Sequence, residues 1–227
     1  MRKGFLPVVA SALVAGAVAL SGCTVVPIGQ EAKYTGEVTF DAKSQSKDLW
    51  KKVKDEIPSK AADLGELLAA GDAGSLTKDD VIQKFNGKSL STSKVAAGSG
   101  VVYAVKGTGT VTEVNAKAVD KSASSKGTMT VAVDGYAGSK KVVINVGPVI
   151  SDTSLRDYLT SINLNDYKDT TQWSQVSQAI NDTAQKDVID KADIGSLKGK
   201  KISFTGAFTA KTGMTMVSIT PVELSAE

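Results

Sequence analysis

The spacing of hydrophobic residues changes along this chain, and the order of these changes constrains the fold most strongly. From about residue 98 apolar side chains recur at every second position, which is typical of half-buried strands. These residues are Val101, Tyr103, Val105, Val111, Met129, Val131, Val133, Val142, Ile144 and Val146. Helical spacing follows at Leu155, Tyr158, Leu159, Ile162, Trp173, Val176, Ile180 and Ala184. Two more strands are expected over 201–208 and 214–224, with Pro221 placing the last one at an edge.

Three strands, a helical connection and two further strands is the order of an OB-like barrel. The predicted class is therefore α+β, with a five-stranded β-barrel over residues 98–227 that carries a helical insert at 152–192. The glycines at 107 and 109 interrupt the first strand and indicate a bend or a close packing position. An α+β sandwich with the same strand count stays open as an alternative.

The preceding segment, residues 34–97, is expected to hold an extended stretch over 34–40 and a helical subdomain. Helical spacing of Leu49, Trp50, Val53 and Ile57, and then of Ala61, Leu64, Leu67 and Leu68, predicts two helices. Pro58 is expected to separate them. A third short helix is predicted from the capping-box spacing of Thr77 and Asp80, with Gly87 as its stop.

The N-terminus has the pattern of a bacterial lipoprotein signal. Two basic residues precede an apolar run that ends at Leu20, and Ser21-Gly22-Cys23 follows. We expect residues 1–22 to be a signal peptide, Cys23 to be lipidated, and residues 23–33 to be a short tether. The protein would then be bound to membrane lipid through Cys23 and would face the periplasm or another extracytoplasmic space. An uncleaved transmembrane helix is the alternative, but the apolar run is short for a span.

Composition excludes several kinds of chemistry. The 227 residues include no histidine, and the only cysteine is Cys23. This excludes nucleophile systems that need histidine, histidine-ligated zinc and imidazole proton transfer. We expect no cofactor and no metal site. Without residues 1–22 the chain keeps 25 basic against 24 acidic residues, which gives no basic excess for nucleic acid.

The densest polar candidate is the segment 147–157, which is expected to end a strand and open a helix. Backbone N–H groups there, with the Arg156 guanidinium, could hold a small acidic ligand. The candidate ligand-binding residues are Thr153, Arg156, Asp157 and Trp173. The alternative is structural: Ser151 or Asp152 caps the helix, and a carboxylate such as Asp157 or Asp166 neutralises Arg156.

Two other candidates favour structural interpretations. The aspartates of the helical insert lack the spacing of a calcium loop and are interpreted as a solvated face. Trp50 and Trp173 lie at helical core spacing, although an exposed tryptophan would stack on a sugar ring. Their burial decides between packing and sugar binding.

The chain also resembles a known family over nearly all of its mature length. Gly147-Pro148-Val149-Ile150, Leu155-Arg156-Asp157, Asp166-Tyr167, Trp173 and Ala179-Ile180-Asn181 are similar to the signature of an uncharacterised family of predicted periplasmic lipoproteins. This resemblance implies an OB-like barrel with a helical subdomain. Members of the family are often encoded near components of sugar ABC transporters. It brings no activity or substrate. Ser151-Asp152 and Asp169-Thr170 depart from the family's usual Arg-Gly and Asn-Gln.

The expected function is that of a lipid-anchored, non-enzymatic binding or accessory protein of the cell envelope, linked to a carbohydrate ABC transporter. An OB-type nucleic-acid-binding protein is the first alternative, motivated by fold alone. A carboxylate-based envelope hydrolase is the second, motivated by the acids near Arg156.

Overall fold

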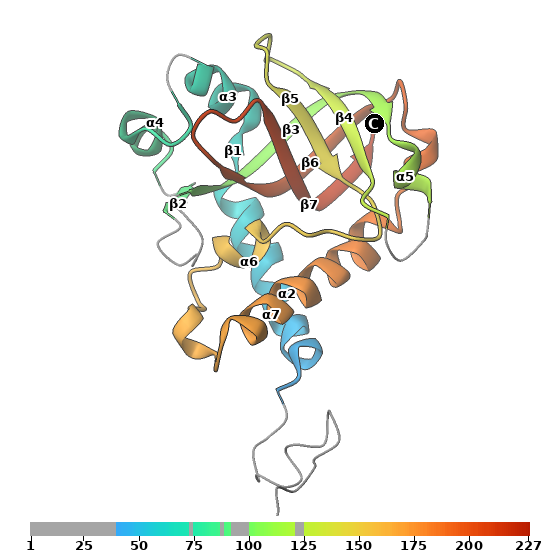
Figure 1. Ribbon diagram of the computed structural model, residues 1–227. Coiled ribbons are helices and arrows are strands. Elements are labelled where there is room, and N and C mark those ends of the chain that lie inside the picture. The colour runs from blue at the N-terminus through green and yellow to red at the C-terminus, as the bar shows by residue number, and fades with distance from the viewer. Residues whose placement is uncertain (1–39, 73–74, 87–88, 92–99, 121–124) are drawn as a thin grey trace, which may run out of the picture. The chain divides into compact units, whose positions relative to one another are not determined.

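Five strands close into a barrel, with helices packed on its outside and at one end (Figure 1). The computed structural model describes residues 40–72, 75–86, 89–91, 100–120 and 125–227. Within them, residues 40–227 belong to one compact unit. The expected signal peptide, Cys23, the tether and residues 34–39 of the expected extended stretch lie outside the described residues, as does Gly87.

The barrel strands are β3 (Val101–Val114), β4 (Thr128–Val133), β5 (Lys141–Asn145), β6 (Lys201–Ala210) and β7 (Met216–Ala226). Their order is β3-β4-β5-β7-β6, and β6 pairs with β3 to close the ring. Only the β5–β7 pair is parallel among these five contacts. This is the predicted OB-like order, and the closure excludes the open sandwich.

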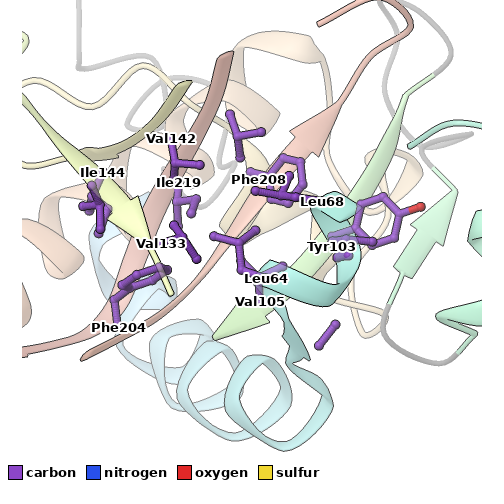
Figure 2. Packing of buried hydrophobic residues seen from close by; sticks show 14 of the residues in the cluster. Leu64, Leu68, Tyr103, Val105, Val133, Val142, Ile144, Phe204, Phe208 and Ile219 are labelled. Atoms are coloured by element: carbon purple, nitrogen blue, oxygen red, sulfur yellow. The ribbon is translucent and has the colours of Figure 1, made fainter. Parts of the chain in front are cut away.

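The barrel interior is filled by the alternating residues that the sequence singles out. Tyr103 and Val105 of β3, Ile144 of β5 and Ile219 of β7 point into one buried cluster (Figure 2). The Tyr103 hydroxyl donates a hydrogen bond of 2.6 Å to the Leu76 carbonyl oxygen. The period of two therefore marks the inner face of each strand correctly.

Close strand contacts explain one of the β3 glycines. A Cβ atom on Gly109 would lie 2.4 Å from the carbonyl oxygen of Ala132 in β4. The register between β3 and β4 then shifts between Val111 and Glu113, which is a bulge. Gly109 is thus a position of close backbone approach.

The remaining elements are α2 (Ala42–Lys60), β1 (Ala62–Asp63), α3 (Leu64–Asp72), α4 (Asp79–Lys84), β2 (Ser89–Ser91), α5 (Ala116–Val119), α6 (Ser154–Tyr158), η1 (Leu164–Asp166), α7 (Thr170–Ala184), η2 (Gln185–Ile189) and η3 (Ile194–Ser196). Leu64 and Leu68 of α3 pack against the barrel interior (Figure 2).

The helices α2, α6 and α7 form a layer outside the barrel. They bury Trp50, Leu155 and Ile180 in a second cluster, together with residues on the outer face of β3 and β6. Those strand residues are Val102, Ala104 and Ala207. One part of the barrel wall is therefore apolar on both sides.

Two expected helix boundaries are wrong. Helix α2 passes Pro58 and ends at Lys60, because proline near the last turn removes only one hydrogen bond. Short strand β1 then pairs with β3, so Ala61 caps α2 and does not open the next helix. The N-cap of α4 is Lys78 and it makes no side-chain cap bond, so the expected capping box is absent. Thr77 instead contacts Thr212 through its hydroxyl, at 3.1 Å.

The prediction that Pro221 lies in an edge strand is also wrong. Strand β7 pairs with β5 on one side and with β6 on the other. Its pairing with β5 covers Met216 to Ile219 and stops before the proline. On the other side the register shifts beside Pro221, so the missing N–H falls at a bulge.

Candidate functional site

A cavity of about 940 Å³ lies over β4, β5 and β7. Its strand residues are Thr128, Asn145, Thr209, Met216 and Ser218. Its loop residues are Gly100, Lys126, Gly127, Val149, Ser151, Asp152, Thr153, Lys211, Thr212 and Met214, and Asp157 comes from α6. Most of the lining residues carry a hydroxyl, amide or charged group, and Val149, Met214 and Met216 are apolar. A cavity of this size fits a small polar molecule.

The cavity occupies the surface that OB barrels generally use for binding. In barrel order β4 and β5 are the second and third strands, and loop 211–215 joins the fourth to the fifth. The face of strands two and three, with the loops joining strands one to two and four to five, is the general ligand surface of this fold. Fold alone does not name the ligand.

A chain of hydrogen bonds forms the floor of the cavity. The Ser218 hydroxyl donates to Asn145 Oδ1 at 3.0 Å. Asn145 Nδ2 donates to the Thr220 hydroxyl at 3.1 Å, and that hydroxyl donates to Asp152 Oδ2 at 2.8 Å. These contacts fix the orientation of the Asn145 amide, because its oxygen and its nitrogen are each engaged on one side.

Asp152 is the end of this chain and joins it to the helical layer. Its carboxylate accepts from Thr220, from the Ser154 hydroxyl and from the backbone N–H groups of Thr153 and Ser154. Burial raises the pKa of Asp152 above its usual range, although these hydrogen bonds act in the opposite direction. Asn181 of α7 donates to the backbone oxygen of Asp152 at 2.6 Å and holds the loop in place.

Arg156 forms a buried ion pair with its neighbour Asp157. Its Nε and Nη2 donate to Asp157 Oδ1 at 2.8 and 2.6 Å, and Nη1 donates to the Trp173 carbonyl oxygen at 2.9 Å. The other carboxylate oxygen of Asp157 accepts from the Thr153 hydroxyl at 2.6 Å. The Arg156 side chain is 3% exposed and that of Asp157 is 1% exposed. This pairing is the one that the structural alternative for segment 147–157 expects.

The two tryptophans belong to the helical layer. Trp50 and Trp173 are both 5% exposed. The guanidinium carbon of Arg156 lies 4.2 Å from the ring centroid of Trp173, which is a cation–π contact. Burial therefore favours packing over sugar stacking for both rings.

The structure separates the four candidate residues into two pairs. Thr153 and Asp157 line the cavity, whereas Arg156 and Trp173 lie in the helical layer and do not line it. Asn145 and the lysines at 126 and 211 are lining residues that the sequence prediction missed. The signal for Asn145 was its position directly after the inward-facing Ile144, which places its side chain on the outer face.

Other features of the described residues bear on function. No three of their acidic, histidine or cysteine side chains lie close enough to hold a metal ion. The helices of the described part are too short or too polar to cross a bilayer. A second hollow of about 730 Å³ lies between β3, β6, β7 and η2, and charges of both signs line it.

A closed five-stranded barrel with this strand order, helices and an open polar cavity defines an OB-fold protein. The chain belongs to the predicted periplasmic lipoprotein family DUF2291, whose model matches residues 13–225. Family membership implies a lipid anchor and an extracytoplasmic membrane location. The family's function is unknown, and it carries no assigned substrate.

A solved structure supports the fold. The crystal structure of an OB-fold protein from Thermotoga maritima matches with a TM-score of 0.61 and 15% sequence identity. The match covers 84% of this chain and 100% of that chain. A comparison with curated proteins found no match.

Proposed function

We propose that this protein is a non-enzymatic binding or accessory protein of the cell envelope, lipid-anchored through Cys23, and that it binds a small polar molecule. The observation that carries the proposal is the cavity over β4, β5 and β7. Its floor is a hydrogen-bonded chain that presents an oriented amide, Asn145, toward the open space. Oriented polar groups of this kind give a polar ligand its specificity.

The partner that we propose is a component of a carbohydrate ABC transporter. This part rests on the resemblance described from the sequence and on the hydroxyl-rich lining of the cavity. A lipid-anchored binding protein would present a sugar to such a transporter at the membrane surface.

The alternative of a hydrolase has one observation in its favour, since Asp152 and Asp157 line the same cavity. Both carboxylates are engaged, however. Asp157 is paired with Arg156, and Asp152 accepts hydrogen bonds from Thr220, Ser154 and the backbone. A general acid or base needs a carboxyl group that can reach the substrate proton, and neither group is free to do so here.

The nucleic-acid alternative has less support. A binding surface for single strands combines a basic groove with stacking aromatic rings. No aromatic residue among those that the structure describes lines the cavity, and both tryptophans are buried.

Ligand binding is tested by thermal unfolding of the mature, acylated protein in detergent, with a panel of neutral and charged monosaccharides. A ligand that binds only the folded state raises the melting temperature. We expect a rise with at least one sugar, loss of the rise in Asn145→Ala, and no loss in the control Ser174→Ala on the exposed side of α7. No rise with any sugar would count against the binding role.

The anchor and the partner have their own tests. Cys23→Ser is expected to move the protein from the membrane fraction to the soluble fraction, and mass spectrometry of the wild type is expected to show acyl chains on residue 23. Affinity purification from membranes is expected to recover a sugar transporter component. Recovery of no envelope protein would contradict the partner.

A further inference from the structure

Two lysines line the cavity without a carboxylate among the described residues that pairs with them. Lys126 and Lys211 both line it and are exposed. They come from two different loops, one before β4 and one after β6. Neither ammonium group forms an ion pair with a described residue. Two lysines without an ion-pair partner among the described residues therefore line the same cavity.

The two carboxylates of the lining do not offset these cations for a ligand. Asp157 is shielded by Arg156 and by the Thr153 hydroxyl, and its side chain is 1% exposed. Asp152 accepts from two hydroxyls and two backbone N–H groups, which occupy both of its oxygens. Among the described lining residues, a ligand therefore finds two lysines without an ion-pair partner and no carboxylate oxygen without a hydrogen bond.

Between the lysines the cavity offers neutral hydrogen-bonding groups. After its two contacts in the floor, Asn145 keeps one N–H and one lone pair for a ligand. Thr128, Thr209 and Thr212 line the same space, and the Thr212 hydroxyl also contacts that of Thr77. Groups that both donate and accept suit a ligand with several hydroxyls, and Met214 and Met216 offer apolar contact for its C–H groups.

We infer that this cavity binds a small anionic molecule that carries several hydroxyl groups, of the class of sugar acids and sugar phosphates. The ammonium groups of Lys126 and Lys211 hold the anionic group, and Asn145 with the threonine hydroxyls holds the sugar hydroxyls. This inference rests on the proposed binding function and specifies its ligand class.

The test measures binding to the full mature protein in detergent by calorimetry and thermal unfolding. The probes are glucuronate, glucose 6-phosphate, glucose and inorganic phosphate. We expect the two charged sugars to bind more tightly than glucose or phosphate, and salt to weaken their binding. The double variant Lys126→Gln/Lys211→Gln is expected to bind them about tenfold or more weakly, since charge-assisted hydrogen bonds are lost.

A matched control removes the same charge elsewhere. Lys52→Gln/Lys198→Gln changes two exposed lysines that do not line the cavity and is expected to leave binding unchanged. Preference between glucuronate and glucose 6-phosphate distinguishes a carboxylate from a phosphate ligand, and either preference supports the inference.

Three results would overturn it. Equal binding of glucose and the charged sugars, unaffected by the lysine variant, would overturn the anionic class and leave the binding function standing. Binding of phosphate as tight as that of glucose 6-phosphate would overturn the role of the hydroxyls. Binding of none of the probes or of the sugar panel would contradict both the inference and the proposed function.

Discussion

The outer wall of the barrel has two parts with opposite chemistry. On β3 and β6 the outward residues Val102, Ala104 and Ala207 are apolar, and helices α2, α6 and α7 cover them. On β4 and β5 the outward residues Thr128 and Asn145 are polar and line the cavity, whereas the outward Val143 of β5 is apolar and buried. We call these the covered wall and the open wall.

The inner face of these strands does not differ in this way. Tyr103 and Val105 of the covered wall and Met129 and Ile144 of the open wall all pack in the same interior cluster. The two walls therefore differ in their outward residues, which occupy every second position of each strand. A strand buried on both faces is apolar at consecutive positions, whereas a half-buried strand alternates. The outward residues decide where helices dock and where a ligand can enter.

The largest expected effect breaks the ion pair within the covering helices. Arg156→Ala leaves the Asp157 carboxylate buried without its partner, and it removes the contact with the Trp173 ring. We expect a loss of about 3–5 kcal/mol in the free energy of unfolding, measured with denaturant. The double variant Arg156→Met/Asp157→Leu removes both charges and is expected to lose less. An equal loss in both variants would show that packing, not charge, accounts for the effect.

A polar substitution on each wall tests the comparison directly. Ala104→Asn places an amide under the helices, where Ala104 is fully buried, and is expected to cost about 3 kcal/mol. Thr128→Asn on the open wall keeps its side chain in the cavity and is expected to cost less than about 1 kcal/mol. Similar losses for the two variants would mean that the walls do not differ in energetic terms.

The loop that joins the two walls is probed at Asp152. Asp152→Ala leaves the Thr220 hydroxyl and two backbone N–H groups without their acceptor, and we expect a loss of about 2 kcal/mol. The same variant is expected to weaken ligand binding, because Thr220 no longer fixes the Asn145 amide. Unchanged stability would show that water replaces these contacts.

One buried tyrosine lies in the barrel interior and another in the covering helices, and their hydroxyls differ in hydrogen bonding. The Tyr103 hydroxyl bonds to the Leu76 carbonyl, but the Tyr158 hydroxyl has no partner among the described residues. Tyr103→Phe is expected to cost about 1 kcal/mol, and Tyr158→Phe is expected to cost nothing measurable. A loss in Tyr158→Phe would indicate a bound water on that hydroxyl.

The dependence of stability on alkaline pH tests the same two tyrosines, Tyr103 and Tyr158. Burial raises the pKa of each phenol from 10.0 to about 12. A group with a raised pKa in the folded state contributes stability that is complete below pH 10 and is lost as pH rises to about 12. Each Phe variant is expected to flatten this decline in unfolding experiments at increasing pH.

The strand order and the buried helix faces could be predicted from the sequence. Both depend on local periodicity, and Leu155, Val176 and Ile180 are buried as their spacing indicates. Boundaries were less predictable, since they depend on partners. The pairing of β1 with β3 and the contact of Thr77 with Thr212 set the ends of α2 and α4. The bulge beside Pro221 depends on β6 in the same way.

The candidate site was only partly predictable for a related reason. Segment 147–157 does contribute Thr153 and Asp157 to the cavity. The lysines at 126 and 211 are distant from it in sequence, and only the closure of the barrel brings them to the same place. Arg156 has the right chemistry for an anion, but its own neighbour Asp157 neutralises it.

The hydrogen bonds in the cavity floor have a consequence for communication across the molecule. They run from Ser218 through Asn145 and Thr220 to Asp152, whose backbone is held by Asn181 of α7. A ligand that restrains the Asn145 amide thereby restrains the loop on which α7 depends. Occupancy of the cavity is thus coupled to the contact between this loop and α7.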